Sequence, residues 1–162
     1  MNIFWSYAKL DNRMPRKLTK LRHAFNISLD QSTGFENKVV VDESDLKWGT
    51  DWKKEISRLI KESDAVITLI SPSYFNSKMC IEELGLALNE SKKILPIYYR
   101  NCPNGFRSDF IQDGNDENAE LNSISLKIAA IQHKDFRALR NKDFESEEVQ
   151  NFLDEITGDI TE

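Results

Sequence analysis

Short apolar runs alternate with longer amphipathic segments along most of the chain. An apolar or β-branched run that is bounded by polar residues is typical of a strand. Four such runs predict strands at Asn2–Ser6, Lys38–Val41, Asp64–Ser71 and Lys92–Tyr99. A fifth, weaker strand is predicted at Lys134–Leu139.

The segments between these runs carry apolar residues at helical spacing. Leu18, Leu21, Phe25 and Leu29 form one such series, for which Asp11 and Asn12 are predicted caps and Pro15 suits the first turn. Further helices are predicted over residues 51–63, 79–88 and 121–131 and around Val149–Ile156.

Alternating strands and helices predict an α/β fold with a parallel sheet. Five strands suit a flavodoxin-like three-layer sandwich, with strand order 2-1-3-4-5 and helices on both faces. With no long Pro/Gly/Ser linker, we expect one domain over 1–162. It divides into a motif-bearing core over 2–100, a less regular part over 101–120, and a closing strand and helix over 132–157.

This topology predicts where a ligand would bind. In such sheets the crevice lies at the carboxyl ends of strands 1 and 3, where the strand order reverses. The first strand ends at Ser6-Tyr7-Ala8 and the third at Ser71-Pro72. The helix that follows Pro72 therefore begins at the edge of the predicted crevice.

That helix carries two adjacent glutamates. Helical geometry places Glu83 between apolar neighbours, whereas Glu82 faces solvent. A carboxylate flanked in this way is partly desolvated, which raises its pKa and favours a functional role. The alternative is a surface glutamate near a helix N-terminus, where the dipole favours negative charge.

Composition limits the classes of function. With 162 residues, 40% hydrophobic and 30% charged, and a net charge of −5, the chain is typical of a soluble globular domain. The basic segment Arg13–Arg22 is interpreted as a solvated helix face rather than a nucleic-acid site. Two cysteines make no disulfide framework, and neither a secretory signal nor a membrane span is present, so a cytoplasmic location is expected.

Several kinds of site are disfavoured by the residues present. The acidic run after Asp113 lacks the glycine and glutamate of a calcium loop. No G-x-G-x-x-G follows a strand, and the first and third strands lack the acidic residues of a phospho-receiver domain. His23 and His133 are too isolated for a metal site. Cys80 is interpreted as a core thiol rather than a nucleophile.

The first half of the chain resembles the TIR domain, the Toll/interleukin-1 receptor homology module. The resemblance is carried by a set of residues in family order and spacing rather than by any single element. These residues are Ser6-Tyr7, Asp11, Asp42, Leu46, Gly49, Trp52, Ile56, Ser63, Ser71-Pro72-x-Tyr74, Ser77 and Cys80-x-x-Glu83-Leu84.

The resemblance implies a chemistry for Glu83. TIR domains with this Cys-x-x-Glu pattern include enzymes that cleave the nicotinamide–ribose bond of NAD⁺, and their catalytic glutamate falls on Glu83. A fixed carboxylate can stabilise the oxocarbenium-like ribose left when nicotinamide departs. NAD⁺ would be the substrate, no separate cofactor is expected, and the products would be nicotinamide and ADP-ribose or a cyclic ADP-ribose isomer. Expected substrate-binding residues are Ser6, Tyr7, Ala8, Asp42, Trp48, Gly49, Met79 and Cys80.

The chain departs from this pattern at Met79, where many such enzymes carry tryptophan. Methionine also packs against rings. Trp48 either supplies an aromatic face or anchors its loop on the domain or on another copy. Tyr7 is either a pocket wall or plain packing.

The same resemblance implies self-association through the loop Asp42–Thr50, which would order the substrate pocket. A fused or separate sensor protein would control assembly, and a bacterial immune or antiphage role would suit a short TIR domain. The alternative function is a non-catalytic adaptor that uses these surfaces only for contacts between TIR domains. Neither nucleic acid nor membrane is an expected partner.

Overall fold

The computed structural model describes residues 1–42, 51–103, 105 and 116–162, with side chains of the helix at 116–129 described from Ser123 onward. Five parallel strands form one sheet in the order β2-β1-β3-β4-β5, as the sequence predicts. The strands are β1 (Asn2–Ser6), β2 (Lys38–Val41), β3 (Ala65–Ile70), β4 (Lys93–Tyr98) and β5 (Lys134–Asp135).

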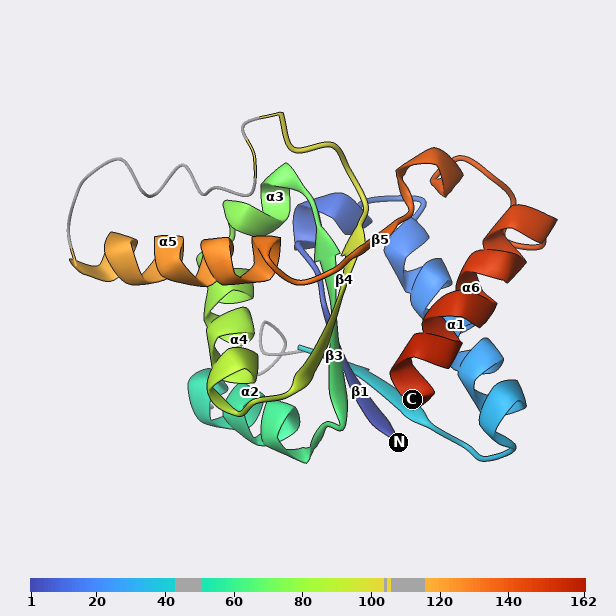
Figure 1. Ribbon diagram of the computed structural model, residues 1–162, viewed down its shortest axis with the longest axis horizontal. Coiled ribbons are helices and arrows are strands. Elements are labelled where there is room, and N and C mark those ends of the chain that lie inside the picture. Colours follow the sequence, from blue (N-terminus) through green and yellow to red (C-terminus); the bar gives the residue numbers. More distant parts are fainter. Residues whose placement is uncertain (43–50, 104, 106–115) are drawn as a thin grey trace.

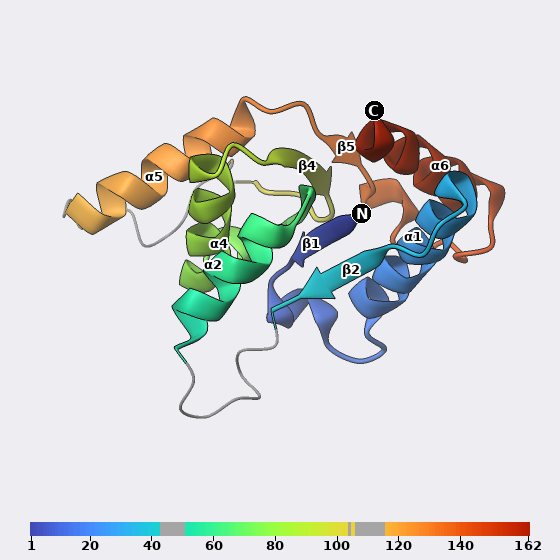
Figure 2. The same cartoon turned by 90° about the horizontal axis from the view of Figure 1, so that it is seen from below.

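Helices cover both faces of this sheet (Figure 1). One face carries α1 (Lys17–Thr33) and α6 (Glu147–Thr161), and the other carries α2 (Trp52–Glu62), α4 (Lys78–Asn89) and α5 (Asp116–Ala129). Figure 2 shows the same division from below. The short elements η1 (Lys9–Asn12), α3 (Pro72–Phe75) and η4 (Arg137–Leu139) follow β1, β3 and β5 in the chain.

Alternate side chains of each strand pack into cores on opposite faces of the sheet. Ile3 and Trp5 of β1 pack in the core under α1 and α6, whereas Phe4 packs against the α2 side. Successive side chains of a strand point to opposite faces, so Ser6 shares the face of Phe4. β3 pairs with β1 so that Thr68 lies opposite Ser6. Ser6 and Thr68 therefore lie on the same face of the sheet.

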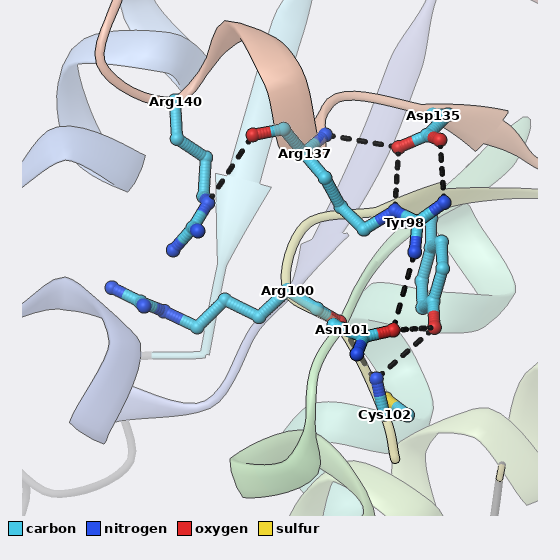
Figure 3. A network of polar contacts seen from close by, with 7 residues as sticks. All are labelled: Tyr98, Arg100, Asn101, Cys102, Asp135, Arg137 and Arg140. Carbon is cyan, nitrogen blue, oxygen red and sulfur yellow. Dashed lines mark hydrogen bonds and ion pairs between the residues drawn. The ribbon is translucent and has the colours of Figure 1, made fainter.

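The predicted fifth strand is wrong beyond its first two residues. Only Lys134 and Asp135 pair with β4. The Asp135 carboxylate then accepts hydrogen bonds from the Arg137 backbone N–H at 3.0 Å and from its guanidinium, which turns the chain into η4 (Figure 3). The Arg137 guanidinium also lies 4.0 Å from the centroid of the Tyr98 ring. These local contacts replace the ladder that a longer strand would form.

The predicted cap of the first helix also needs correction. α1 begins at Lys17 after Arg16, which adopts a left-handed conformation, and Pro15 lies outside the helix. Asn12 accepts a hydrogen bond from the Thr19 backbone N–H at 3.1 Å, so it reaches the first turn from η1 rather than from the cap position. Asp11 instead turns toward the edge of the sheet.

Candidate active site

The side chain of Glu83 is buried at the carboxyl edge of the sheet. It lies on α4, whose N-cap Ser77 accepts a hydrogen bond from the Cys80 backbone N–H at 3.3 Å. Ile81 and Leu84 of this helix pack into the core, which rotates Glu83 toward β1. Only 4% of Glu83 is exposed, whereas Glu82 is half-buried. The difference predicted between the two glutamates is therefore present.

Ser6 connects Glu83 to the end of β1. Its Oγ donates a hydrogen bond to Glu83 Oε2 at 2.7 Å and lies 2.9 Å from the Tyr74 hydroxyl. Tyr74, in α3, is fully buried, and its hydroxyl also reaches the Cys80 carbonyl at 3.3 Å. Three elements thus hold one carboxyl group in a fixed position.

Burial raises the pKa of Glu83 well above its ordinary value. The Ser6 hydrogen bond and the positive charge of Lys9 act in the opposite direction, while Asp42 raises the pKa through its charge and through a side-chain hydrogen bond. A proton on Glu83 is favoured because a buried carboxylate loses its hydration and faces a like charge.

A cavity of about 440 Å³ opens beside this carboxyl group. Its walls come from the end of β1, η1, α3 and the first turns of α4. Of the residues expected to bind substrate, Tyr7, Ala8, Asp42, Met79 and Cys80 line it together with Glu83. Trp48 and Gly49 lie outside the described residues. A larger hollow, of about 1260 Å³, lies along β2 and α2 and does not include Glu83.

Ser6 does not lie on the cavity wall, although it was expected to bind substrate directly. It is 1% exposed and its hydroxyl is engaged by Glu83 and Tyr74. Ser6 therefore affects the site by holding the Glu83 carboxyl group rather than by touching the substrate. No local pattern indicates this role, because the contact joins residues 77 positions apart.

Cys80 is a thiol in a protected environment. It is 3% exposed, and its Sγ lies 3.3 Å from the Tyr7 carbonyl oxygen, to which it donates. Burial first, and the nearby Glu83 charge second, raise the pKa of the Cys80 thiol. A thiol that resists ionisation is a poor nucleophile, in agreement with the interpretation as a core residue.

Several residues that line the cavity were not among the expected site residues, although Ser77 belongs to the set that carries the family resemblance. Lys9, Leu10, Ser73, Asn76 and Ser77 line the same cavity. The motif Ser71-Pro72-x-Tyr74 carried the one available signal, because it predicts a turn at the end of the third strand. It did not indicate that the Tyr74 hydroxyl would meet Ser6.

Asp11 fixes η1, which supplies Lys9 and Leu10 to the cavity. Its side chain, 4% exposed, accepts a short hydrogen bond from Ser71 Oγ and lies 3.7 Å from the Arg100 Nε atom. Ser71 in turn caps α3, accepting from the Tyr74 backbone N–H at 3.0 Å. Asp11 thus ties η1 to the ends of β3 and β4, which explains why it does not cap α1.

Among the described residues, no group of three or more His, Cys, Asp or Glu side chains is placed to hold a metal ion. Within the same part of the chain, no helix has the length and apolar character needed to span a membrane.

Replacing Glu83 by glutamine is expected to stabilise the fold at high pH. Because folding raises the pKa of Glu83, the folded state binds the carboxyl proton more tightly than the unfolded chain, in which the ordinary pKa is 4.5. The stability of the native protein therefore falls as pH rises above about 4.5, until the folded pKa is passed. Glutamine stays neutral throughout and does not incur this loss.

Thermal unfolding from pH 4 to pH 9 tests this expectation. The Tm advantage of Glu83→Gln should be near zero at pH 4 and should grow with pH, at about 2–4 °C for each kcal/mol gained. Glu90→Gln, at the exposed end of α4, is the matched control and should show no such trend. If the Tm of Glu83→Gln stays below that of the native chain at pH 8, the folded state does not raise the pKa of Glu83.

Comparisons with known proteins identify relatives of this chain. The family model described as TIR domain matches residues 3–153. A Brachypodium distachyon protein named probable 2′ cyclic ADP-D-ribose synthase is 30% identical over 59 residues. That match covers 36% of this chain and only 26% of the plant protein.

Two solved structures share the fold. The TIR domains of the activated Roq1 resistosome, which directly recognises the pathogen effector XopQ, superpose with a TM-score of 0.67 at 23% identity, covering 98% of each chain. The TIR domain of the Toll-related receptor TRR-2 from Hydra magnipapillata gives a TM-score of 0.58 at 19% identity, covering 99% of this chain and 98% of that one. At these identities the likeness concerns the fold.

Proposed function

Because the chain belongs to the TIR domain family, we propose that it cleaves the nicotinamide–ribose bond of NAD⁺. The observation that carries the proposal is the position of Glu83, a buried acid held by Ser6 at the wall of a cavity. The partial similarity to a plant protein named as a cyclic ADP-D-ribose synthase supports the same chemistry.

The proposed reaction uses Glu83 as a fixed negative charge. As the C–N bond breaks, its electron pair goes to the ring nitrogen and neutral nicotinamide leaves. The ribose becomes an oxocarbenium-like cation, which the Glu83 carboxylate stabilises at close range. Water then adds to the ribose carbon and loses a proton, giving ADP-ribose, or a hydroxyl of the same molecule adds and gives a cyclic isomer.

Substrate binding supplies the ionised form of Glu83. The nicotinamide ring of NAD⁺ is cationic, and a nearby positive charge lowers the pKa of a carboxyl group. Together with Lys9 it opposes the effects of burial and of Asp42. Binding of the cationic ring therefore shifts Glu83 toward the carboxylate form that the reaction uses.

Self-association is part of this proposal. The Roq1 structure contains TIR domains within an activated resistosome, and contacts through the 42–50 loop would order the substrate cavity of this chain. Asp42, which begins that loop, already faces Glu83. Control of NAD⁺ cleavage by assembly would suit an antiphage defence, in which NAD⁺ is depleted or a signal nucleotide is made.

Turnover at increasing protein concentration tests the proposal. Purified chain incubated with NAD⁺ should release nicotinamide, followed by chromatography, with a specific rate that rises as the protein assembles. The alternative is a non-catalytic TIR adaptor, which Met79 in the place of the usual tryptophan favours. Assembled protein that releases no nicotinamide above the buffer rate would establish the adaptor and refute the enzyme.

A further inference from the structure

Glu83 and Met79 line two cavities rather than one. Besides the cavity at the edge of the sheet, both residues border a second cavity of about 390 Å³ between α2, α4 and α5. They lie four positions apart on α4, which places them on the same face of the helix. These two side chains therefore form the shared wall between the cavities.

The two cavities differ in chemistry. The second cavity has a large apolar lining, formed by Trp52, Ile56, Met79, Leu86, Leu88 and Ile124. Its polar and charged lining residues are Lys53, Glu82, Glu83, Asn89, Ser123 and Lys127. Its volume lies at the low end of the range for small-molecule sites, so it suits one part of a dinucleotide. The first cavity instead offers Lys9 and the polar side chains of Ser73, Asn76 and Ser77.

We propose that the second cavity receives the nicotinamide ring, while the first holds the ribose and phosphate part of the substrate. This inference rests on the proposed function. Cleavage of the nicotinamide–ribose bond beside Glu83 divides the substrate into two parts. Each part needs room on its own side of the Glu83 carboxyl group. The ring is flat and cationic, whereas the remainder carries hydroxyls and phosphates.

The side chains of the second cavity match a cationic ring. Trp52 offers an aromatic face, over which Lys53 Nζ now lies 5.5 Å from the indole centroid, and a cationic ring would take the place of this ammonium group. The Met79 thioether packs well against rings. Glu82 adds a negative charge at the rim.

The packing of α4 on α5 provides a way to fill this cavity. A Cβ placed on Gly85 would come within 2.9 Å of Ile124 Cδ1, so the helices already touch at that point. A larger side chain at 124 must therefore extend into the cavity. Leu126, two positions along α5 and 59% exposed, points away from it. Leu126→Phe is thus a matched control for Ile124→Phe.

Binding of nicotinamide alone tests the inference without any turnover. Titration of the methyl-labelled chain with nicotinamide should shift the Ile56, Ile124 and Met79 methyl signals, whereas 5′-AMP should shift Ala8 and leave Ile124 in place. Ile124→Phe should weaken nicotinamide binding at least tenfold, and Leu126→Phe should leave it unchanged. The methyl shifts of the native chain locate the nicotinamide site even if the Ile124→Phe variant does not fold.

The opposite results overturn the assignment. Nicotinamide that shifts Ala8 but not Ile124, or 5′-AMP that shifts Ile124, would place the base elsewhere. Either result leaves the Glu83 reaction intact if NAD⁺ is still cleaved. Conversely, nicotinamide seated beside Ile124 in a chain that never cleaves NAD⁺ would retain the site and refute the reaction.

Discussion

Glu83→Gln is expected to lower kcat for nicotinamide release about 100- to 1000-fold. Glutamine keeps the shape of the side chain and can still accept the hydrogen bond from Ser6. It carries no charge, so it cannot stabilise the positive ribose that forms as nicotinamide leaves. Initial rates of nicotinamide release measure the effect, at a protein concentration where both proteins assemble to the same extent.

Two features make this experiment decisive. The variant is expected to be at least as stable as the native chain at neutral pH, because a neutral amide avoids the cost of a buried charge. Loss of activity then cannot be assigned to unfolding. Glu90→Gln removes an exposed glutamate from the end of the same helix and should retain full activity. If Glu83→Gln releases nicotinamide at a rate within tenfold of the native rate, the Glu83 carboxylate does not stabilise the ribose cation.

Ser6→Ala is expected to lower kcat/KM about 10- to 100-fold at neutral pH, because a hydrogen bond to a charged group contributes about 1.5–3 kcal/mol. The Ser6 hydroxyl stabilises the ionised form of Glu83, lying 2.7 Å from its Oε2 atom. Its removal raises the pKa of Glu83 further. The acid limb of kcat/KM, which reports the free protein, should therefore move to higher pH.

Thr68→Val is the matched control for Ser6→Ala. Thr68 lies opposite Ser6 in the sheet, and its buried Oγ1 has no hydrogen-bond partner among the described residues. Removing that hydroxyl should leave both the rate and the pH profile unchanged. If Ser6→Ala lowers the rate equally at every pH, with no displacement of the acid limb, Ser6 does not act by tuning Glu83.

The sequence predicted those parts of the site that depend on local periodicity. Helical spacing alone separated Glu83 from Glu82, and the structure buries the first and half-exposes the second. Strand alternation and the sheet order placed the crevice where Ser6 and Ser71 end their strands. The difference between the glutamates follows from neighbours within a few residues, whereas the position of the crevice follows from the general rule for this strand order.

The features that sequence reasoning missed depend on contacts between distant segments. The Ser6–Tyr74 contact and the Ser71–Asp11 hydrogen bond join residues 68 and 60 positions apart. No short sequence motif predicts either contact. The early end of β5 follows from a side chain, Asp135, that binds the next turn. The pairing of Asp42 with Glu83 likewise joins two distant segments, the end of β2 and α4.

A structure of Glu83→Gln with NAD⁺ bound tests the central claim most directly, because the variant should bind the dinucleotide without consuming it. The account predicts that the ribose carbon bonded to nicotinamide lies about 3–3.5 Å from the carboxamide of residue 83. NAD⁺ bound in the hollow along β2 and α2, with residue 83 out of contact with the ribose, would contradict it.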